Sequence, residues 1–124
     1  MPIEQLLLIF LRENGINAAP MAPADPQEIQ GEYVSVSRVA NTTDFRTGLA
    51  STTMALDCFI PNPETNGGDR FQAYGLANSV SNLIYPFIRE TPRVRTLQDM
   101  SISDSSDSRF TYYTIMITLY HHTT

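Results

Sequence analysis

Few side chains in this 124-residue sequence could perform covalent or metal chemistry. Cys58 is the only cysteine, and His121 and His122 are the only histidines. Cys58 falls in a period-two row of apolar residues, which is typical of a buried and unreactive thiol. The adjacent histidines end a predicted strand, so their side chains point to opposite faces and do not form one metal site. We expect Cys58 in the core and the two histidines in a solvated tail.

Three other groups of polar residues could bind ions. Residues Gly67–Arg70 precede a predicted helix, where anions can bind, but lack the lysine and spacing of a phosphate loop. Asp104 and Asp107 lack the ligand density of a calcium loop, and a turn is the simpler interpretation. Arg93 and Arg95 could hold an anion or a partner's carboxylate, or could line a solvated face. We therefore predict a non-enzymatic protein with no catalytic residue, no metal site and no cofactor.

Composition narrows the classes of partner. The chain has no lysine, eight arginines and a net charge of −5, a poor match for stable binding to nucleic acid or to an anionic membrane. The longest apolar run, Leu6–Leu11, is too short to span a bilayer, and no basic leader precedes it. We expect a soluble, unexported chain that forms a single domain over residues 1–124.

Hydrophobic periodicity and turn residues predict six elements. The helices are expected at Pro2–Asn14 and from Asp69 to about Tyr85, where Pro86 ends or kinks the second one. The strands are expected at Tyr33–Val39, Thr52–Ile60, Pro92–Met100 and Arg109–Tyr120, and the connections at Asn17–Gly31, Asn41–Ala50 and Ser101–Ser108. The order helix-strand-strand-helix-strand-strand predicts an α+β fold, a small, mostly antiparallel sheet packed against two α-helices.

The second helix lacks charge where charge is usual. No charged residue occurs from Phe71 to Ile88, although an apolar stripe marks this as a surface helix with one buried face. Aromatic and amide side chains without charge are typical of protein interfaces. We predict that the outward residues contact a neighbouring subunit: Phe71, Tyr74, Asn78, Asn82 and Tyr85.

The last strand shows the same pattern. It has no charge from Phe110 to Tyr120 and is apolar on both faces, although a sheet covered by helices on one side should be polar on the other. The surplus apolar residues predict a second part of the subunit interface: Phe110, Tyr112, Met116 and Tyr120. Coverage by the proline-rich segment or by the first helix is the alternative.

The predicted loop Asn41–Ala50 is long for a hairpin connection. Phe45 and Arg46 combine an apolar side chain with a guanidinium, a pairing enriched at interface hot spots. We predict that this loop is ordered by a neighbouring ring of a different protein. A tolerant surface loop with Phe45 folded onto the core is the alternative.

The chain resembles the tail terminator (tail completion, head–tail joining) proteins of long-tailed bacteriophages along nearly its whole length. The resemblance rests on the order and spacing of six segments: the apolar helix Ile3–Leu11, a proline-interrupted connection, the strands Tyr33–Val39 and Met54–Phe59, the alanine-rich helix around Ala73 and Leu76, and the strand Arg109–Ile115. A double glycine often found in the family's first polar loop is replaced here by Val39-Ala40-Asn41.

The resemblance implies a structural virion protein that assembles in the host cytoplasm. Members of that family form a ring, usually hexameric, that caps the head-proximal end of the tail tube, stops its polymerisation and joins it to the neck. DNA passes transiently through the lumen, and an acidic chain is compatible with such passage. The implied partners are a second copy of the chain, the tail tube protein and the head–tail connector, with no membrane.

Three alternatives remain open on the sequence. A head-closure or neck adaptor would share the virion setting and differ in its partners. A small-ligand-binding oligomeric module would use the aromatic residues to line a pocket. An oligomeric cytoplasmic scaffold would share the interface composition without any virion role.

Overall fold

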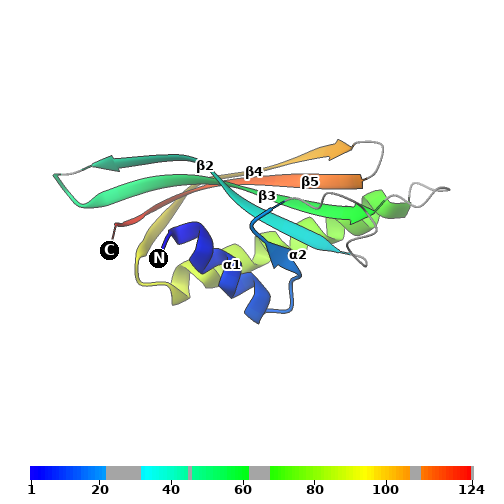
Figure 1. Cartoon of the computed structure of the whole chain (residues 1–124), viewed down its shortest axis with the longest axis horizontal. Coiled ribbons are helices and arrows are strands. Elements are labelled where there is room, and N and C mark those ends of the chain that lie inside the picture. The colour runs from blue at the N-terminus through cyan, green and yellow to red at the C-terminus, as the bar shows by residue number, and fades with distance from the viewer. Residues whose placement is uncertain (22–31, 45, 62–67, 107–109, 124) are drawn as a thin grey trace.

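The fold is a two-layer sandwich of one sheet and two helices (Figure 1). The computed structural model describes residues 1–21, 32–44, 46–61, 68–106 and 110–123, with the backbone alone for 61, 68–71, 105–106 and 110–111. In chain order the elements are α1 (Ile3–Glu13), β1 (Ala18–Ala19), β2 (Tyr33–Asp44), β3 (Leu49–Pro61), α2 (Gly68–Glu90), β4 (Val94–Ser106) and β5 (Phe110–His122). Both helices cover the same face of the sheet, which confirms the predicted α+β class.

The sheet is mixed, and its strand order is β1-β2-β3-β5-β4. The predicted order helix-strand-strand-helix-strand-strand is wrong because the short strand β1 runs parallel to β2 within the segment expected as a connection. The end of α1 holds β1 in place, since Arg12 Nε donates to the Ala18 carbonyl at 2.8 Å. Val34 N donates to the Asn17 carbonyl at 2.8 Å. A strand of this length has too few residues for its alternation to be recognised in the sequence.

The prediction of a loop over Asn41–Ala50 is also wrong. The pairing of β2 with β3 continues from Asn41 opposite Thr52 to Asp44 opposite Leu49, which leaves a tight turn. Gly48 N donates to the Asp44 carbonyl at 3.0 Å, and Gly48 has a φ of 72°, a conformation that glycine adopts without strain. Thr42 and Thr43 are β-branched and suit a strand, and neither is buried, so the hydrophobic alternation used for prediction is missing there.

The predicted serine-rich turn, Ser101–Ser108, is mostly strand. β4 pairs with β5 from Ser101 opposite Met116 to Ser106 opposite Thr111, while residues 107 and 108 lie outside the described part. β4 is an edge strand, and its outward serines need no apolar neighbour because backbone hydrogen bonds hold it to β5. Two register shifts, at Val94/Thr96 and Leu97/Asp99, interrupt the pairing near its start.

The helices match their predicted positions, with one difference in length. α1 begins after Pro2, and the chain leaves it at Gly15, whose φ is 85°. α2 continues through Pro86 to Glu90, so the expectation that the helix ends near Tyr85 is wrong. Phe87 is fully buried after the proline, and this packing offsets the backbone hydrogen bond that Pro86 cannot donate.

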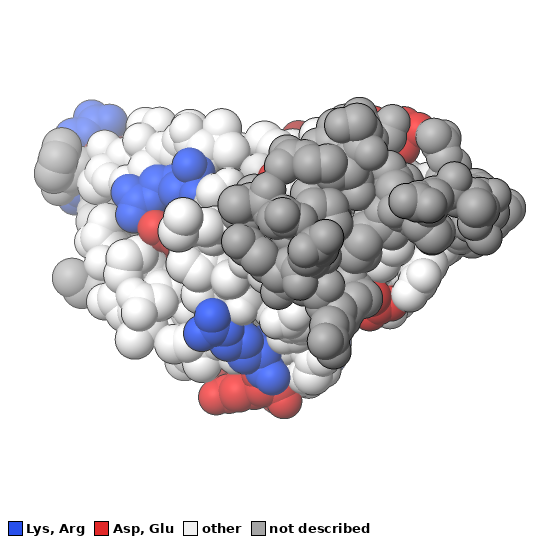
Figure 2. All heavy atoms as spheres, turned by 45° about the vertical axis from the view of Figure 1, so that its right-hand side comes forward, with Lys and Arg blue, Asp and Glu red and all other residues white. Residues whose placement is uncertain are grey.

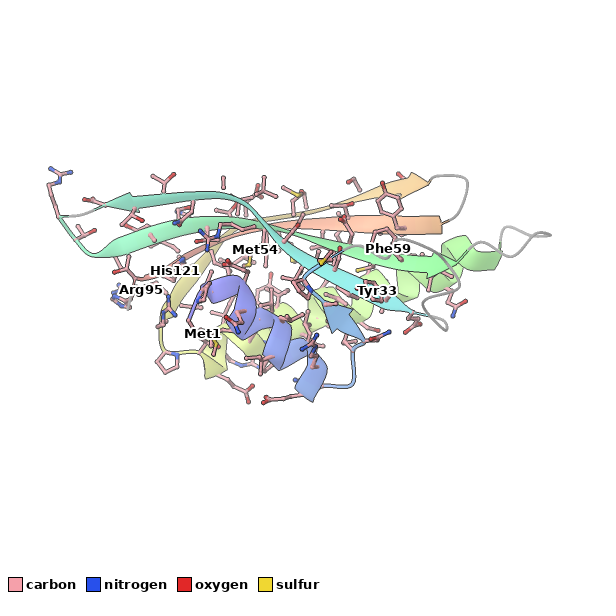
Figure 3. The ribbon with its side chains drawn as sticks, viewed as in Figure 1. Met1, Tyr33, Met54, Phe59, Arg95 and His121 are labelled. Carbon is pink, nitrogen blue, oxygen red and sulfur yellow. The ribbon has the colours of Figure 1, made fainter. Side chains whose placement is uncertain are left out.

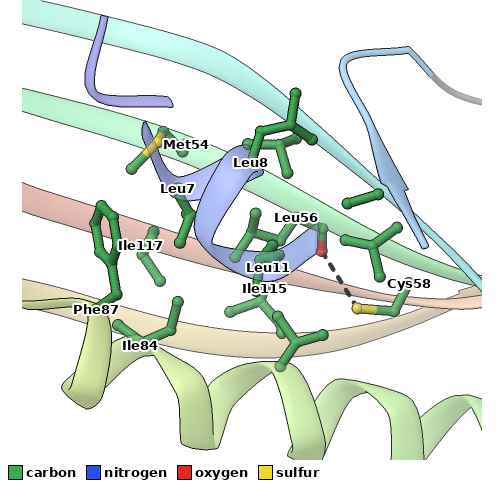
Figure 4. Close-up of a cluster of buried hydrophobic side chains, with 14 of the residues drawn as sticks. Leu7, Leu8, Leu11, Met54, Leu56, Cys58, Ile84, Phe87, Ile115 and Ile117 are labelled. Atoms are coloured by element: carbon green, nitrogen blue, oxygen red, sulfur yellow. Dashed lines mark hydrogen bonds between the residues drawn. The ribbon is translucent and has the colours of Figure 1, made fainter. Parts of the chain in front are cut away.

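The core lies between the sheet and the helices (Figure 4). Leu7 and Leu11 of α1 and Phe87 of α2 are fully buried against Leu56 and Ile117 of the sheet. Leu8, off the main apolar face of α1, is buried as well, so this helix is covered on more than one side. Apolar residues thus fill the interior from both helices and the three long central strands.

Cys58 is part of this core, as predicted. It is fully buried, its Sγ lies 3.9 Å from the Leu56 carbonyl, and burial, helped by the charges of Asp57 and Glu32, raises the pKa of the thiol to about 12. We expect Cys58→Ala to lower the free energy of unfolding by about 1–2 kcal/mol through lost packing. The native thiol should resist alkylation at pH 8, since only the thiolate reacts. Rapid labelling of the folded protein would contradict this burial.

Candidate interaction surfaces

The first candidate surface is the outer face of α2, formed by Tyr74, Asn78, Asn82 and Tyr85. All four side chains are exposed, with Tyr74 at 49% and Tyr85 at 54%. The buried side of the helix packs on β3 and β5, and this face is exposed, with Tyr74 at its edge nearest the sheet. Tyr74 is held in place by an edge-to-face contact with Tyr113, with the ring centroids 5.6 Å apart. The side chain of Phe71, predicted to share this face, lies outside the described part.

The second candidate surface is the open sheet face, the side of the sheet opposite the helices. Tyr33, Phe59 and Tyr112 lie in register on β2, β3 and β5 and form an aromatic row across it. The centroid distances are 6.4 Å for Tyr33–Phe59 and 4.9 Å for Phe59–Tyr112. Tyr33 Oη also donates to the Met21 carbonyl at 2.7 Å, which ties this row to the segment after β1. Phe59 is only 6% exposed, and Tyr33 and Tyr112 are partly buried against it, so the row forms a small second apolar cluster at one end of the sheet, where Figure 3 places Tyr33 and Phe59.

Some polar side chains of the open sheet face bind one another. Thr53 Oγ1 and Thr118 Oγ1 are 2.9 Å apart, and Thr114 Oγ1 donates to Asp57 Oδ1 at 2.6 Å. These two pairs join four side chains of the face, while Ser101 and Ser103 of β4 are exposed on it. The paired groups can be covered by another protein at a small desolvation cost.

The predicted interface residues on β5 occupy this face. Tyr112, Met116 and Tyr120 are partly buried, and Ile115, Ile117 and Leu119 point into the core on the other side of β5. α1 lies on the same side of the sheet as α2, so the alternative that the first helix covers the open sheet face is wrong (Figure 1). The side chain of Phe110 and most of the proline-rich segment lie outside the described residues.

The turn of the β2–β3 hairpin carries the third predicted contact. Arg46 is highly exposed, and its Nε lies 3.6 Å from Asp44 Oδ1. Arg46 N donates to the same carboxylate oxygen at 2.9 Å, so Asp44 shapes the turn. Phe45 lies outside the described residues.

His121 is not in a solvated tail, contrary to our prediction. It continues β5 and is 4% exposed, with Nε2 2.7 Å from Thr52 Oγ1 and Nδ1 2.8 Å from the His122 carbonyl. It borders a polar cavity of about 230 Å³ that also contacts Glu4 and Arg38, which are joined at 2.7 Å. The period-two row Ile115, Ile117, Leu119 could have identified this burial, since its next member is His121.

The arginines Arg93 and Arg95, predicted as a pair, have different surroundings. Arg93 donates to three backbone carbonyls, those of Met1, His122 and Thr123. Arg95 is exposed, near Met1 and His121 at one end of the molecule (Figure 3). Arg93 therefore joins the two ends of the chain, and the pair does not form one anion site.

The other ion-binding motifs do not assemble into a site in the described part of the chain. Asp104 lies in β4 opposite Tyr113, and Asp107 is outside the described residues. Gly68 begins α2, while Gly67 and the side chains of residues 68–71 are not described. The described residues contain no cluster of acidic, histidine or cysteine side chains able to hold a metal ion.

Charged side chains are scattered on the surface shown in Figure 2, with uncharged surface between them. The described arginines on that face do not merge into a continuous basic stripe, the feature that sustained binding to a nucleic acid backbone requires. None of the described helices combines the length and hydropathy needed to cross a membrane.

No protein-family model matches the chain, and no curated protein is significantly similar to it in sequence. The assignment of function therefore rests on the surfaces and on the resemblance described above.

The role of Arg93 can be tested against that of Arg95. We expect Arg93→Lys to lower the free energy of unfolding by about 1–2 kcal/mol, because one ammonium cannot reach three separate carbonyls. Arg95→Lys, the matched control, should change it by less than about 0.5 kcal/mol. Urea denaturation monitored by circular dichroism measures both. Equal effects of the two changes would contradict the role of Arg93.

The buried contact between Thr52 and His121 gives a second test. Thr52→Val removes the hydroxyl that His121 Nε2 contacts. We expect this change to lower the free energy of unfolding by about 1–3 kcal/mol, because the buried imidazole nitrogen loses its partner. Thr42→Val, at an exposed position of β2, serves as the control and should be nearly neutral. The free energy of unfolding of both variants is measured by urea denaturation. If Thr52→Val lowers it no more than Thr42→Val does, the contact between Thr52 and His121 does not stabilise the fold.

Proposed function

We propose that this protein is a ring-forming structural subunit of a long-tailed bacteriophage virion, of the tail terminator type. The observation that carries the proposal is the outer face of α2, where exposed tyrosines and asparagines occur on a helix without a charged residue from Gln72 to Ile88. Monomeric proteins usually place charges on such a face, whereas subunit interfaces deplete them and enrich tyrosine.

The open sheet face supplies the second patch that a ring requires. The two patches point in opposite directions, because the inner side of α2 packs on the sheet. The α2 face of one copy can then meet the open sheet face of the next. Such head-to-tail contacts close into a ring when the rotation between neighbours is constant.

The resemblance supplies the partners in this proposal. The ring caps the head-proximal end of the tail tube, stops its polymerisation and binds the neck, with DNA passing through the lumen. The net charge of −5 supports passage of DNA without retention, since acidic surfaces repel phosphate. A neck adaptor would use the same surfaces and would be distinguished by co-purification with the connector but not with the tube.

We expect the purified protein to form a ring of defined subunit number, seen as a single native mass and as closed particles in negative stain. Tyr74→Glu should weaken assembly by about 3 kcal/mol, because it buries an unpaired carboxylate between subunits. The subunit should stay folded, since Tyr74 is half exposed in the isolated chain.

The control for this experiment is Gln5→Glu, which adds the same charge at an exposed position of α1. It should leave the native mass unchanged. A monomeric wild type at high concentration would refute the ring, and normal assembly of Tyr74→Glu would exclude the α2 face from the interface.

A further inference from the structure

A groove lies between α1 and α2, on the side of the helices away from the core. It has a volume of about 490 Å³ and combines an apolar floor with a polar rim. The floor is formed by Leu6, Ile9, Phe10 and Phe87, and the rim by Glu13, Asn14, Glu90 and Thr91. We call it the acidic groove. Its volume could accommodate two large side chains of a partner.

Three of the four floor residues leave apolar surface accessible, while Phe87 is fully buried beneath them. Ile9 is 36% exposed, and Leu6 and Phe10 are only partly buried at the edge of the core. The rings of Phe10 and Phe87 are 5.5 Å apart and hold the two helices together at this point. An occupant that covered these side chains would gain hydrophobic free energy.

The rim concentrates negative charge. Glu13 and Glu90 are the last residues of α1 and α2, where the helix macrodipole is negative and disfavours a carboxylate. Neither has an ion-pair partner among the described residues, and no arginine lines the groove. Arg12, which precedes Glu13, donates to the Ala18 carbonyl. The groove therefore favours an occupant that brings a cation.

We propose that this groove receives the β2–β3 turn of a second copy of the chain, with Arg46 placed between Glu13 and Glu90. The Arg46 side chain is 92% exposed, and its contact with Asp44 is long at 3.6 Å. The hairpin projects past both helices, so that its turn is free to enter a neighbour (Figure 1). The inference rests on the proposed function only in requiring a chain that self-associates.

The other arginines in the described part are less suited to this contact. Arg38 is joined to Glu4, and Arg93 is held by three backbone carbonyls. Arg89 is exposed but adjoins Glu90 on the same helix, and Arg95 lies on β4 rather than on a projecting turn. Arg46 alone among these combines exposure with a projecting element.

Turn and groove are different parts of one molecule, so the contact is head-to-tail and consistent with a closed ring. This assignment differs from our sequence prediction, in which Arg46 contacts a ring of another protein. Phe45 lies outside the described residues and carries no part of the argument.

Charge reversal and rescue test the proposal. Glu13→Arg with Glu90→Arg, and separately Arg46→Glu, should each raise the dissociation constant of assembly about tenfold or more. The three changes combined should restore assembly, because they exchange the two signs of charge. Sedimentation velocity over a concentration series measures each constant.

Folding and specificity are checked in parallel. Arginine at the C-terminal ends of the two helices interacts favourably with the helix macrodipole. The variant with Glu13→Arg and Glu90→Arg should therefore have a melting temperature at or above that of the wild type. Glu13→Gln with Glu90→Gln provides a neutral version and should show an intermediate loss of assembly. Arg95→Glu, a charge reversal outside the proposed contact, should leave assembly unchanged.

The outcomes separate this inference from the proposed function. If the wild type forms rings and the reversals leave the dissociation constant unchanged, the groove contact is wrong and the ring proposal stands. Loss of assembly without rescue by the combined changes would also overturn it. Intact rings of Arg46→Glu that fail to join a tail tube or connector would instead assign the turn to a different protein. A monomeric wild type would overturn the ring and the groove contact together.

Discussion

The pairing of β3 with β5 is the interaction on which the rest of the structure depends. The two thirteen-residue strands are opposed from Leu49 and His122 to Pro61 and Phe110. This register places Met54, Leu56 and Cys58 on the same side as Ile115 and Ile117, and both helices cover that side. A shift by one residue would turn every one of these side chains to the opposite face. β2 then pairs with β3 on one side of this pair and β4 with β5 on the other, and β1 is added at the edge beyond β2.

The sequence predicted the parts of the fold that have a buried face. Alternation identified β3 and β5, and helical spacing identified α1 and most of α2, because burial selects apolar residues at those periods. The predictions failed where backbone pairing alone determines the structure. Asn41–Asp44 and Ser101–Ser106 are strands with polar side chains, and β1 is too short to show a period.

The candidate surfaces were also predicted only in part from the sequence. The exposure of Tyr74 and Tyr85 followed from the position of the apolar stripe on α2. The burial of His121 was missed because a chain end was assumed to be solvated, whereas Thr52 contacts its side chain and Arg93 binds the carbonyl of the next residue, His122. The acidic groove could not be found in the sequence, since Glu13 and Glu90 are far apart along the chain and converge only when the two helices cross.

The irregular edge of β4 has a consequence for solubility. A long regular edge strand invites further strands to add to it, which leads to open-ended fibres. Here two bulges near the start of β4 disturb the spacing of its outward amides, and Asp99 and Asp104 place negative charge along the strand. Both features oppose growth of the sheet by edge addition. If the chain self-associates as proposed, this edge directs association to contacts between faces, which can limit the number of copies.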